Sequence, residues 1–256
     1  MNAATEFFEG FGGAQLALHR MGSAKGSGRP VVLLHGLFSS AEVNWIKFGT
    51  AAQLAAAGFE CLMPDLRVHG QSAAPHDAAA YPADVLVRDA QALVAHLGLT
   101  DFDLVGFSLG ARTAARSVIA GMKPRRLVLA GMGLQGLSGW ARRQDFFVDV
   151  IDRFGTIRPG DPAYLSQQFL KTMGVDRVAA RLLLQSMEDT EAAALDAITM
   201  PTLVLCGDKD DDNGSADALA AALPDGRRAT IPGTHMSSVT VPDMGRELVT
   251  FLTGSA

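Results

Sequence analysis

Cysteine is scarce in this 256-residue chain, which contains only Cys61 and Cys206. Each lies within or at the end of a short apolar run, a position typical of a buried free thiol. Two such residues exclude a small scaffold held together by disulfides, and their spacing does not suggest a metal site. We therefore expect two buried thiols, no bound metal, and a reducing compartment, for which the cytoplasm fits best.

Long hydrophobic runs and an excess of one charge are also missing. No apolar stretch approaches the roughly 20 residues that cross a bilayer, and residues 1–13 lack the basic flank and apolar run of a signal peptide. The 22 basic and 27 acidic residues give a net charge of -5 without long like-charge blocks. These absences argue against nucleic acid and membranes as partners. The expected partner is a small-molecule substrate, and the oligomeric state stays open, a homo-oligomer included.

Short apolar runs alternate with longer helical patterns along most of the chain. Residues 31–34, 59–63, 102–105, 127–130, 203–206 and 228–231 predict strands, and segments 6–11 and 15–19 predict an added hairpin. This alternation predicts an α/β fold, a mostly parallel sheet with helices on both faces.

The alternation breaks in residues 136–200, where no strand pattern appears and apolar residues recur at helical spacing. We predict a helical cap inserted between a first core part, residues 1–135, and a second, residues 201–256. A long strand connection packed against the core is the alternative. If the insertion is a cap, its apolar residues, Trp140, Phe146 and Phe147 among them, would line the substrate entrance.

A G-x-S-x-G pentapeptide, residues 106–110, stands between a predicted strand and a predicted helix. An abrupt strand-to-helix turn strains the backbone at Ser108, and glycines two residues away on either side leave room for the turn. The turn exposes the hydroxyl, and the N–H of Leu109 lies at a helix N-terminus, where developing negative charge is stabilised. We predict that Ser108 is a nucleophile.

The other polar clusters also follow predicted strands. Asp210 comes after the run 203–206, and His235 follows the run 228–231. The carboxyl ends of parallel strands form the edge where such sheets bind ligands. The order Ser108, Asp210, His235 is the chain order of an α/β-hydrolase triad.

These features together resemble the α/β-hydrolase superfamily, in its branch of small bacterial serine esterases with a helical cap. The resemblance covers most of the chain outside 136–200, and His35-Gly36 and the D-x-R-G-H-G-x-S-like stretch 65–72 belong to it. Val68 departs from the family, whose members usually have glycine there, and we expect it to alter the loop without removing a catalytic group. Ala111 also replaces a common glycine, and it should be tolerated if its helix packs slightly farther from the sheet.

The resemblance implies a role for each residue. Ser108 would attack an acyl carbon, His235 would take and return its proton, and Asp210 would orient the imidazolium. The N–H groups of Leu37 and Leu109 would hold the oxyanion, and no cofactor is needed. Three further aspartates, Asp208, Asp211 and Asp212, lie beside Asp210. They leave open which carboxylate is the triad acid.

Other polar residues carry more modest expectations. His35 should shape the oxyanion loop, His69 should hydrogen-bond within its own turn, and Asp65 should pair with Arg67 beneath the site. Arg112 lies one helical turn after Ser108 and is a candidate for binding a substrate carboxylate. A solvated or backbone-bonded arginine is the alternative for Arg112.

Two competing motifs fail on context. Residues 131–136 spell G-x-G-x-x-G after a strand, but no second strand ending in an acidic residue follows about twenty positions later. Residues 208–212 imitate the start of a calcium loop, but its sixth position is Asn213 and its twelfth is Leu219. The sequence therefore predicts neither a dinucleotide nor a metal.

The predicted function is hydrolysis of a small, mostly apolar carboxylic ester through an acyl-enzyme. Carbon-carbon bond hydrolysis, lactone hydrolysis and cofactor-free perhydrolysis are alternatives on the same scaffold. A serine at position 108 argues against dehalogenase and epoxide hydrolase chemistry, which depend on an aspartate nucleophile. A non-catalytic binding protein with a hydrolase fold is the alternative from another class.

Overall fold

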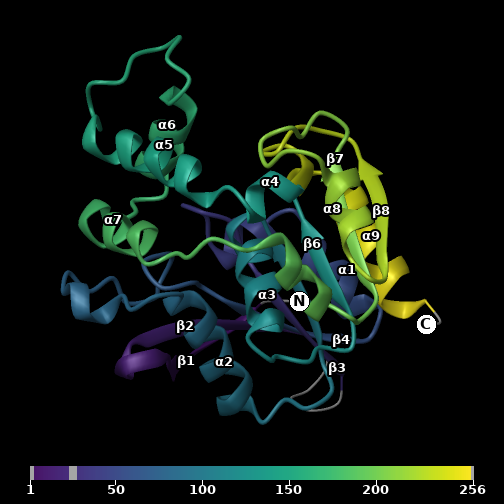
Figure 1. Ribbon diagram of the computed structural model, residues 1–256. Helices are drawn as coiled ribbons and strands as arrows, with labels where there is room; N and C mark the ends of the chain where they lie inside the picture. The colour runs from purple at the N-terminus through teal and green to yellow at the C-terminus, as the bar shows by residue number, and fades with distance from the viewer. Residues whose placement is uncertain (1–2, 23–27, 255–256) are drawn as a thin grey trace.

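The protein is built around one eight-stranded sheet, seen in a computed structural model that describes residues 3–22 and 28–254 (Figure 1). Met1 and Asn2, which belong to the segment predicted not to be a signal peptide, lie outside the described residues. The strands are β1 (Ala4–Glu9), β2 (Gln15–Met21), β3 (Arg29–Leu34), β4 (Phe59–Pro64), β5 (Asp103–Phe107), β6 (Leu127–Ala130), β7 (Thr202–Gly207) and β8 (Gly226–Ile231).

The strand order is β1-β2-β4-β3-β5-β6-β7-β8. The first two strands form the predicted hairpin, and β2 joins β4 antiparallel, while every pairing from β4 to β8 is parallel. The predicted α/β architecture is confirmed. Parallel strands buried on both faces consist of nearly continuous apolar residues, as the runs in the sequence indicate.

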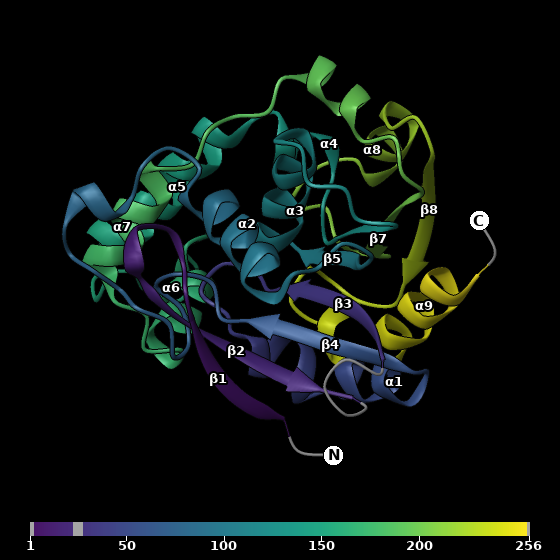
Figure 2. The ribbon, with the colours of Figure 1, turned by 90° about the horizontal axis from the view of Figure 1, so that it is seen from below.

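Helices cover both faces of this sheet (Figure 2). One face packs against α1 (Thr50–Ala56) and α9 (Pro242–Thr253), and the other against α2 (Val85–Leu97), α3 (Leu109–Ile119) and α8 (Ala216–Ala222). Alternate residues of a strand point to opposite faces, so Val31 and Leu33 belong to one core and Val32 and Leu34 to the other.

Cys61 and Cys206 are both buried free thiols, as predicted. They belong to different cores, on opposite faces of the sheet. Burial raises the pKa of Cys61 to about 12 and that of Cys206 to about 11. Both thiols are therefore protonated and unreactive at neutral pH.

Residues 136–200 contain no strand and connect β6 to β7 through helices. The helices are α4 (Leu134–Leu137), α5 (Trp140–Asp152), α6 (Tyr164–Thr172) and α7 (Arg177–Gln185). In Figure 1, α5, α6 and α7 gather beside one another at one end of the molecule. The division of the chain into core and cap domains stays a prediction.

Short turns complete the chain. They are the 3-10 turns Phe11–Gly13, Ala78–Ala80, Ala192–Ala197 and Ser238–Thr240 and the π turn Glu42–Ile46. Within residues 3–22 and 28–254, no helix is long and apolar enough to span a membrane.

Candidate active site

Ser108 stands at the turn between β5 and α3 with φ 53° and ψ -112°. Such a backbone is costly for a non-glycine residue, about 1–3 kcal/mol, and the surrounding structure must enforce it. Both flanking glycines are required by close packing: a Cβ on Gly106 would lie 2.2 Å from the Gly110 oxygen, and one on Gly110 would lie 2.0 Å from the Leu34 oxygen. Ala111, in contrast, fits the core without any exposed surface.

A continuous hydrogen-bond chain links the three predicted triad residues. The Nε2 atom of His235 lies 3.0 Å from Ser108 Oγ, and its Nδ1 atom lies 3.0 Å and 3.1 Å from the two carboxylate oxygens of Asp210. The Phe107 ring packs against the His235 ring, with 5.0 Å between centroids. The three residues follow β5, β7 and β8, so the parallel sheet brings them to one edge.

The contact with His235 Nδ1 distinguishes Asp210 from its acidic neighbours. Its side chain is buried, whereas Asp208 accepts a hydrogen bond from the Gly233 N–H, and Asp211 and Asp212 are exposed. Among these four aspartates, only Asp210 contacts His235 in the described part of the chain.

Two leucines line the same small cavity as Ser108. They are Leu37, in the loop after β3, and Leu109, the first residue of α3. In the described part of the chain, neither amide donates a hydrogen bond to a protein acceptor. Two such donors beside a nucleophile are suited to hold an oxyanion.

Side chains on both sides of Leu37 fix its loop. The Gly36 N–H donates to Asn44 Oδ1 at 3.0 Å, and the Phe38 N–H donates to His69 Nε2 at 3.0 Å. The neighbouring amides are thus occupied, and only that of Leu37 is left for a ligand. The sequence did not identify Asn44, and it predicted for His69 only the bond within its own turn.

Both histidines beneath the loop are neutral. His35 donates from Nδ1 to the Gly36 carbonyl and accepts the Leu66 N–H at Nε2, while His69 donates from Nδ1 to the Arg67 carbonyl. Each ring therefore needs one nitrogen without a proton. Burial lowers the pKa of His35, and burial and the neighbouring His35 lower that of His69 to about 3. The expectation that His35 shapes this loop agrees with these contacts.

Asp65 ties together three segments behind the site. Its carboxylate accepts hydrogen bonds from His19 Nε2 and from the N–H groups of Ala41 and Gln71. Burial alone would raise its pKa, but these hydrogen bonds and His35 lower it to about 2. Asp65 is therefore an ionised structural residue at neutral pH.

The predicted pair of Asp65 and Arg67 is wrong. Arg67 instead forms a two-pronged ion pair with Asp89 of α2, at 2.9 Å and 2.7 Å, and also donates to the carbonyls of Phe11 and Ala80. Both Arg67 and Asp65 are buried, but each has partners from distant segments. Sequence proximity suggested the wrong partner because the loop turns the two side chains apart.

Ser108 opens into a second, larger cavity of about 660 Å³. The helices α5 and α6 supply Phe146, Phe147, Leu165 and Phe169 to its wall, and the Phe147 ring meets Phe38 of the core edge-on, with 5.7 Å between centroids. Phe146 and Phe147 thus line a cavity together with Ser108, and their role at a substrate entrance stays a prediction. A cavity of this size, lined mostly by apolar groups, suits a small organic molecule.

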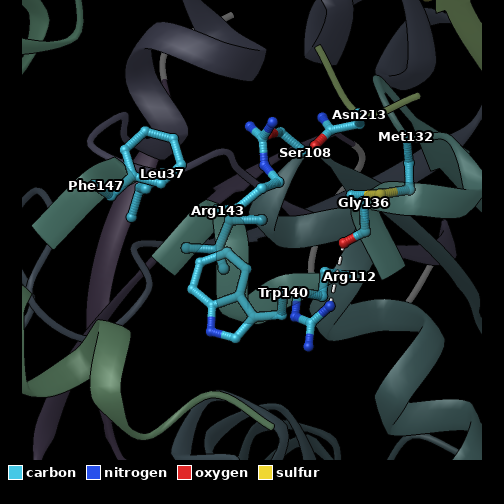
Figure 3. Close-up of a pocket in the computed structure, with 10 residues that line it drawn as sticks. Leu37, Ser108, Arg112, Met132, Gly136, Trp140, Arg143, Phe147 and Asn213 are labelled. Atoms are coloured by element: carbon cyan, nitrogen blue, oxygen red, sulfur yellow. Dashed lines mark hydrogen bonds between the residues drawn. The ribbon is translucent and has the colours of Figure 1, made fainter. Parts of the chain in front are cut away.

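Trp140 and Arg112 lie by the small cavity, which measures about 20 Å³ (Figure 3). Arg112 is buried, with its guanidinium 5.0 Å from the Trp140 ring centroid, and donates to the carbonyls of Gly136, Leu137 and Glu188. Backbone acceptors therefore occupy much of its hydrogen-bonding capacity. The alternative of a backbone-bonded arginine describes these contacts of Arg112, and its role in substrate binding stays a prediction.

Arg143 of α5 is a site residue that the sequence interpretation missed. It borders both cavities, and in Figure 3 its guanidinium extends toward Ser108 while that of Arg112 points to the Gly136 carbonyl. The available signal was a cation among the aromatic residues Trp140, Phe146 and Phe147. On an amphipathic helix, that cation also fits an ordinary solvent-facing position.

The glycines of the G-x-G-x-x-G stretch have packing roles. A Cβ on Gly131 would lie 2.7 Å from the Phe107 ring and 3.1 Å from His235 Cε1, and one on Gly133 would lie 2.2 Å from the Gly214 oxygen. Gly131 also has a φ of 58°. These contacts account for Gly131 and Gly133, two of the three glycines of the stretch, without a dinucleotide.

Comparison with known proteins agrees with this architecture. Residues 29–120 match the family model described as the alpha/beta hydrolase fold. A non-heme haloperoxidase from Rhodococcus erythropolis is 29% identical over 265 residues, covering 89% of this chain and 93% of the relative. Two solved structures are similar: an esterase from Exiguobacterium antarcticum (TM-score 0.79, 21% identity, 98% and 100% coverage) and an enol-lactonase from Burkholderia xenovorans LB400 (TM-score 0.74, 19% identity, 97% and 100% coverage).

The sheet, the turn at Ser108 and these relatives define a hydrolase-type α/β enzyme. The chain has the alpha/beta hydrolase fold, which the family model matches over residues 29–120 and which the solved structures share. The family model and the enzyme-named relatives support a hydrolase activity.

Proposed function

We propose that the protein is a serine hydrolase that cleaves a small, mostly apolar carboxylic ester through an acyl-enzyme intermediate. The observation that carries the proposal is the chain of hydrogen bonds Asp210–His235–Ser108, ending beside the two unpaired amides of Leu37 and Leu109. The mostly apolar 660 Å³ cavity supports an apolar substrate.

The reaction follows from the atoms in place. Ser108 Oγ bonds to the ester carbonyl carbon while its proton passes to His235 Nε2, and the Leu37 and Leu109 amides hold the resulting oxyanion. Collapse breaks the carbon-oxygen bond, and the alcohol leaves with the proton from His235. Water then repeats the sequence on the acyl-enzyme and releases the carboxylic acid. Asp210 stabilises the imidazolium in both halves.

A second acceptor for the acyl group is hydrogen peroxide, which would yield a peracid in place of the acid. The similarity to a haloperoxidase over 89% of the chain favours this activity as the second candidate. It uses the same acyl-enzyme and needs no cofactor. Peracid formed from an ester and hydrogen peroxide would demonstrate it.

The test is Ser108→Ala, assayed with chromogenic esters of graded acyl length. Removal of the nucleophile should lower kcat by at least about 10⁴-fold, with the free energy of unfolding changed by less than about 1 kcal/mol, since no core packing is lost. A fluorophosphonate should label the wild type and leave the variant unlabelled.

Ser166→Ala is the matched control, because Ser166 borders the large cavity without belonging to the hydrogen-bond chain. Its turnover should stay within about threefold of the wild type. Full turnover by Ser108→Ala would refute the nucleophile, and a labelled wild type that cleaves no ester would favour the lactone or carbon-carbon alternatives.

A further inference from the structure

Arg143 is the only arginine or lysine among the described residues that line the large cavity. The rest of that wall is mostly aromatic, aliphatic or uncharged, and Asp212 is its one carboxylate among the described residues. Arg143 also borders the small cavity that Leu37 and Leu109 line. It therefore stands where the two cavities meet, beside the predicted nucleophile.

The positive charge of the Arg143 guanidinium has few compensating contacts. One Nη atom donates to the Asp212 backbone carbonyl, and the ring of Phe147 lies 5.5 Å away. Within residues 3–22 and 28–254, no carboxylate forms an ion pair with it. Two other arginines of this helical segment do have such partners: Arg153 pairs with Asp161, and Arg181 pairs with Asp152.

The Arg143 guanidinium is partly buried, so the lack of a carboxylate partner costs free energy. Burial lowers the pKa of Arg143, while the negative charges of Asp212 and Asp210 act in the opposite direction without restoring it. A partly desolvated guanidinium gains most from an anion that it can bind through two parallel hydrogen bonds, and a carboxylate has that geometry.

We propose that Arg143 binds a carboxylate carried by the substrate. This rests on the proposed function and narrows it: the substrate is an ester with an apolar body and one carboxylate near the scissile bond. The apolar wall accommodates the body, the Leu37 and Leu109 amides bind the reacting carbonyl, and Arg143 fixes the orientation between them. Arg143 is thus a specificity-determining residue, distinct from the nucleophile and its base.

The test compares charged esters with neutral isosteres. On the acyl side, the pair is the mono(4-nitrophenyl) ester of glutaric acid and its glutaramic acid counterpart. On the alcohol side, it is 4-acetoxybenzoate and 4-acetoxybenzamide. The wild type should prefer the carboxylate of at least one pair by tenfold or more in kcat/KM, and the preferred pair identifies the side that carries the charge.

Three variants separate charge recognition from structure. Arg143→Gln should remove the preference by raising KM for the charged ester at least tenfold more than KM for its neutral isostere, and Arg143→Lys should restore part of the preference. Arg142→Gln is the matched control, because Arg142 is adjacent on the same helix and exposed, and it should keep the preference. Equal losses on charged and neutral esters in Arg143→Gln, or no preference in the wild type, would overturn the proposal.

Binding distinguishes this failure from failure of the proposed function. If the wild type cleaves no ester, affinities for 4-phenylbutyrate and 4-phenylbutyramide are measured by calorimetry. The carboxylate should bind the wild type and Arg142→Gln at least tenfold more tightly than the amide, with Arg143→Gln showing no difference. Equal affinities in the wild type would refute the anion site, whatever bond the enzyme cleaves.

Discussion

Asp210 differs from its acidic neighbours in position and not in charge. Its buried carboxylate contacts His235 Nδ1, whereas Asp211 is exposed and accepts the Gly214 N–H through its backbone oxygen. The sequence could place the acid only within a short acidic turn. The side chain that reaches the histidine depends on the loop conformation after β7, which local pattern does not determine.

Asp210→Asn should lower kcat by about 10³–10⁴-fold. The neutral amide cannot stabilise the imidazolium, and its NH₂ group can favour the histidine tautomer that is unable to accept the Ser108 proton. Asp211→Asn is the matched control and should stay within about threefold of the wild type. Steady-state rates with a neutral chromogenic ester measure both, and a larger loss in Asp211→Asn would move the acid to that position.

Residues whose partners are distant were the hardest to predict. Arg67 pairs with Asp89 on α2, and the Phe38 N–H donates to His69 of another loop. No local signal marks these contacts, because they depend on how the loops at the sheet edge lie against one another. The nucleophile was predictable because its strain, its glycines and its helix lie within a few residues.

Helices and strands were predictable where the apolar residues recurred with a clear helical or strand period. All six apolar runs and the hairpin appear as strands, and α2 ends at Leu97 with Gly98 at φ 63°, the left-handed conformation common for a glycine that ends a helix. The loops between elements carried less information. One of them, after β4, contains an unfavourable residue: Val68 adopts φ 79° although it is β-branched.

Substitutions at Val68 should reverse the usual ranking of alanine and glycine. Both Val68→Ala and Val68→Gly lose the buried side chain, but only alanine keeps a Cβ in the left-handed region. We expect Val68→Gly to be more stable than Val68→Ala by about 1 kcal/mol. Urea unfolding of the two variants measures the difference.

The control position is Val87, a similarly buried valine in the first turn of α2. There Val87→Gly should be less stable than Val87→Ala by about 1 kcal/mol, because glycine weakens a helix. The same order at both positions would show that the Val68 backbone is not the source of strain.

The whole molecule brings together residues that are far apart in the chain. Ser108 and His235 are separated by 127 positions, yet parallel strands end at one edge and place the two in hydrogen-bond contact. The parallel strand topology therefore predicted the position of this site better than any single motif did. The loops at this edge also bury two neutral histidines, His35 and His69. This burial makes the free energy of unfolding depend on pH.

Stability should fall as the pH drops from 7.5 to 5.5. The pKa of His69 is about 3 in the folded protein against 6.5 in the unfolded chain, so the unfolded state binds the extra proton in this range and is favoured as pH falls. The contribution of neutral His69 to the free energy of unfolding is complete above pH 6.5 and decreases by about 1.4 kcal/mol between pH 7.5 and 5.5. His35, whose pKa is also lowered, adds to the loss.

Urea unfolding at the two pH values measures this dependence. His69→Gln should remove about 1.4 kcal/mol of the loss between pH 7.5 and 5.5, while His96→Gln, which replaces an exposed histidine of α2, should leave the loss unchanged. Asp65, with a pKa of about 2, adds its own loss only below about pH 4, so it does not interfere in this range. A pH dependence unaltered by His69→Gln would show that this ring is charged in the folded protein, contrary to its two hydrogen bonds.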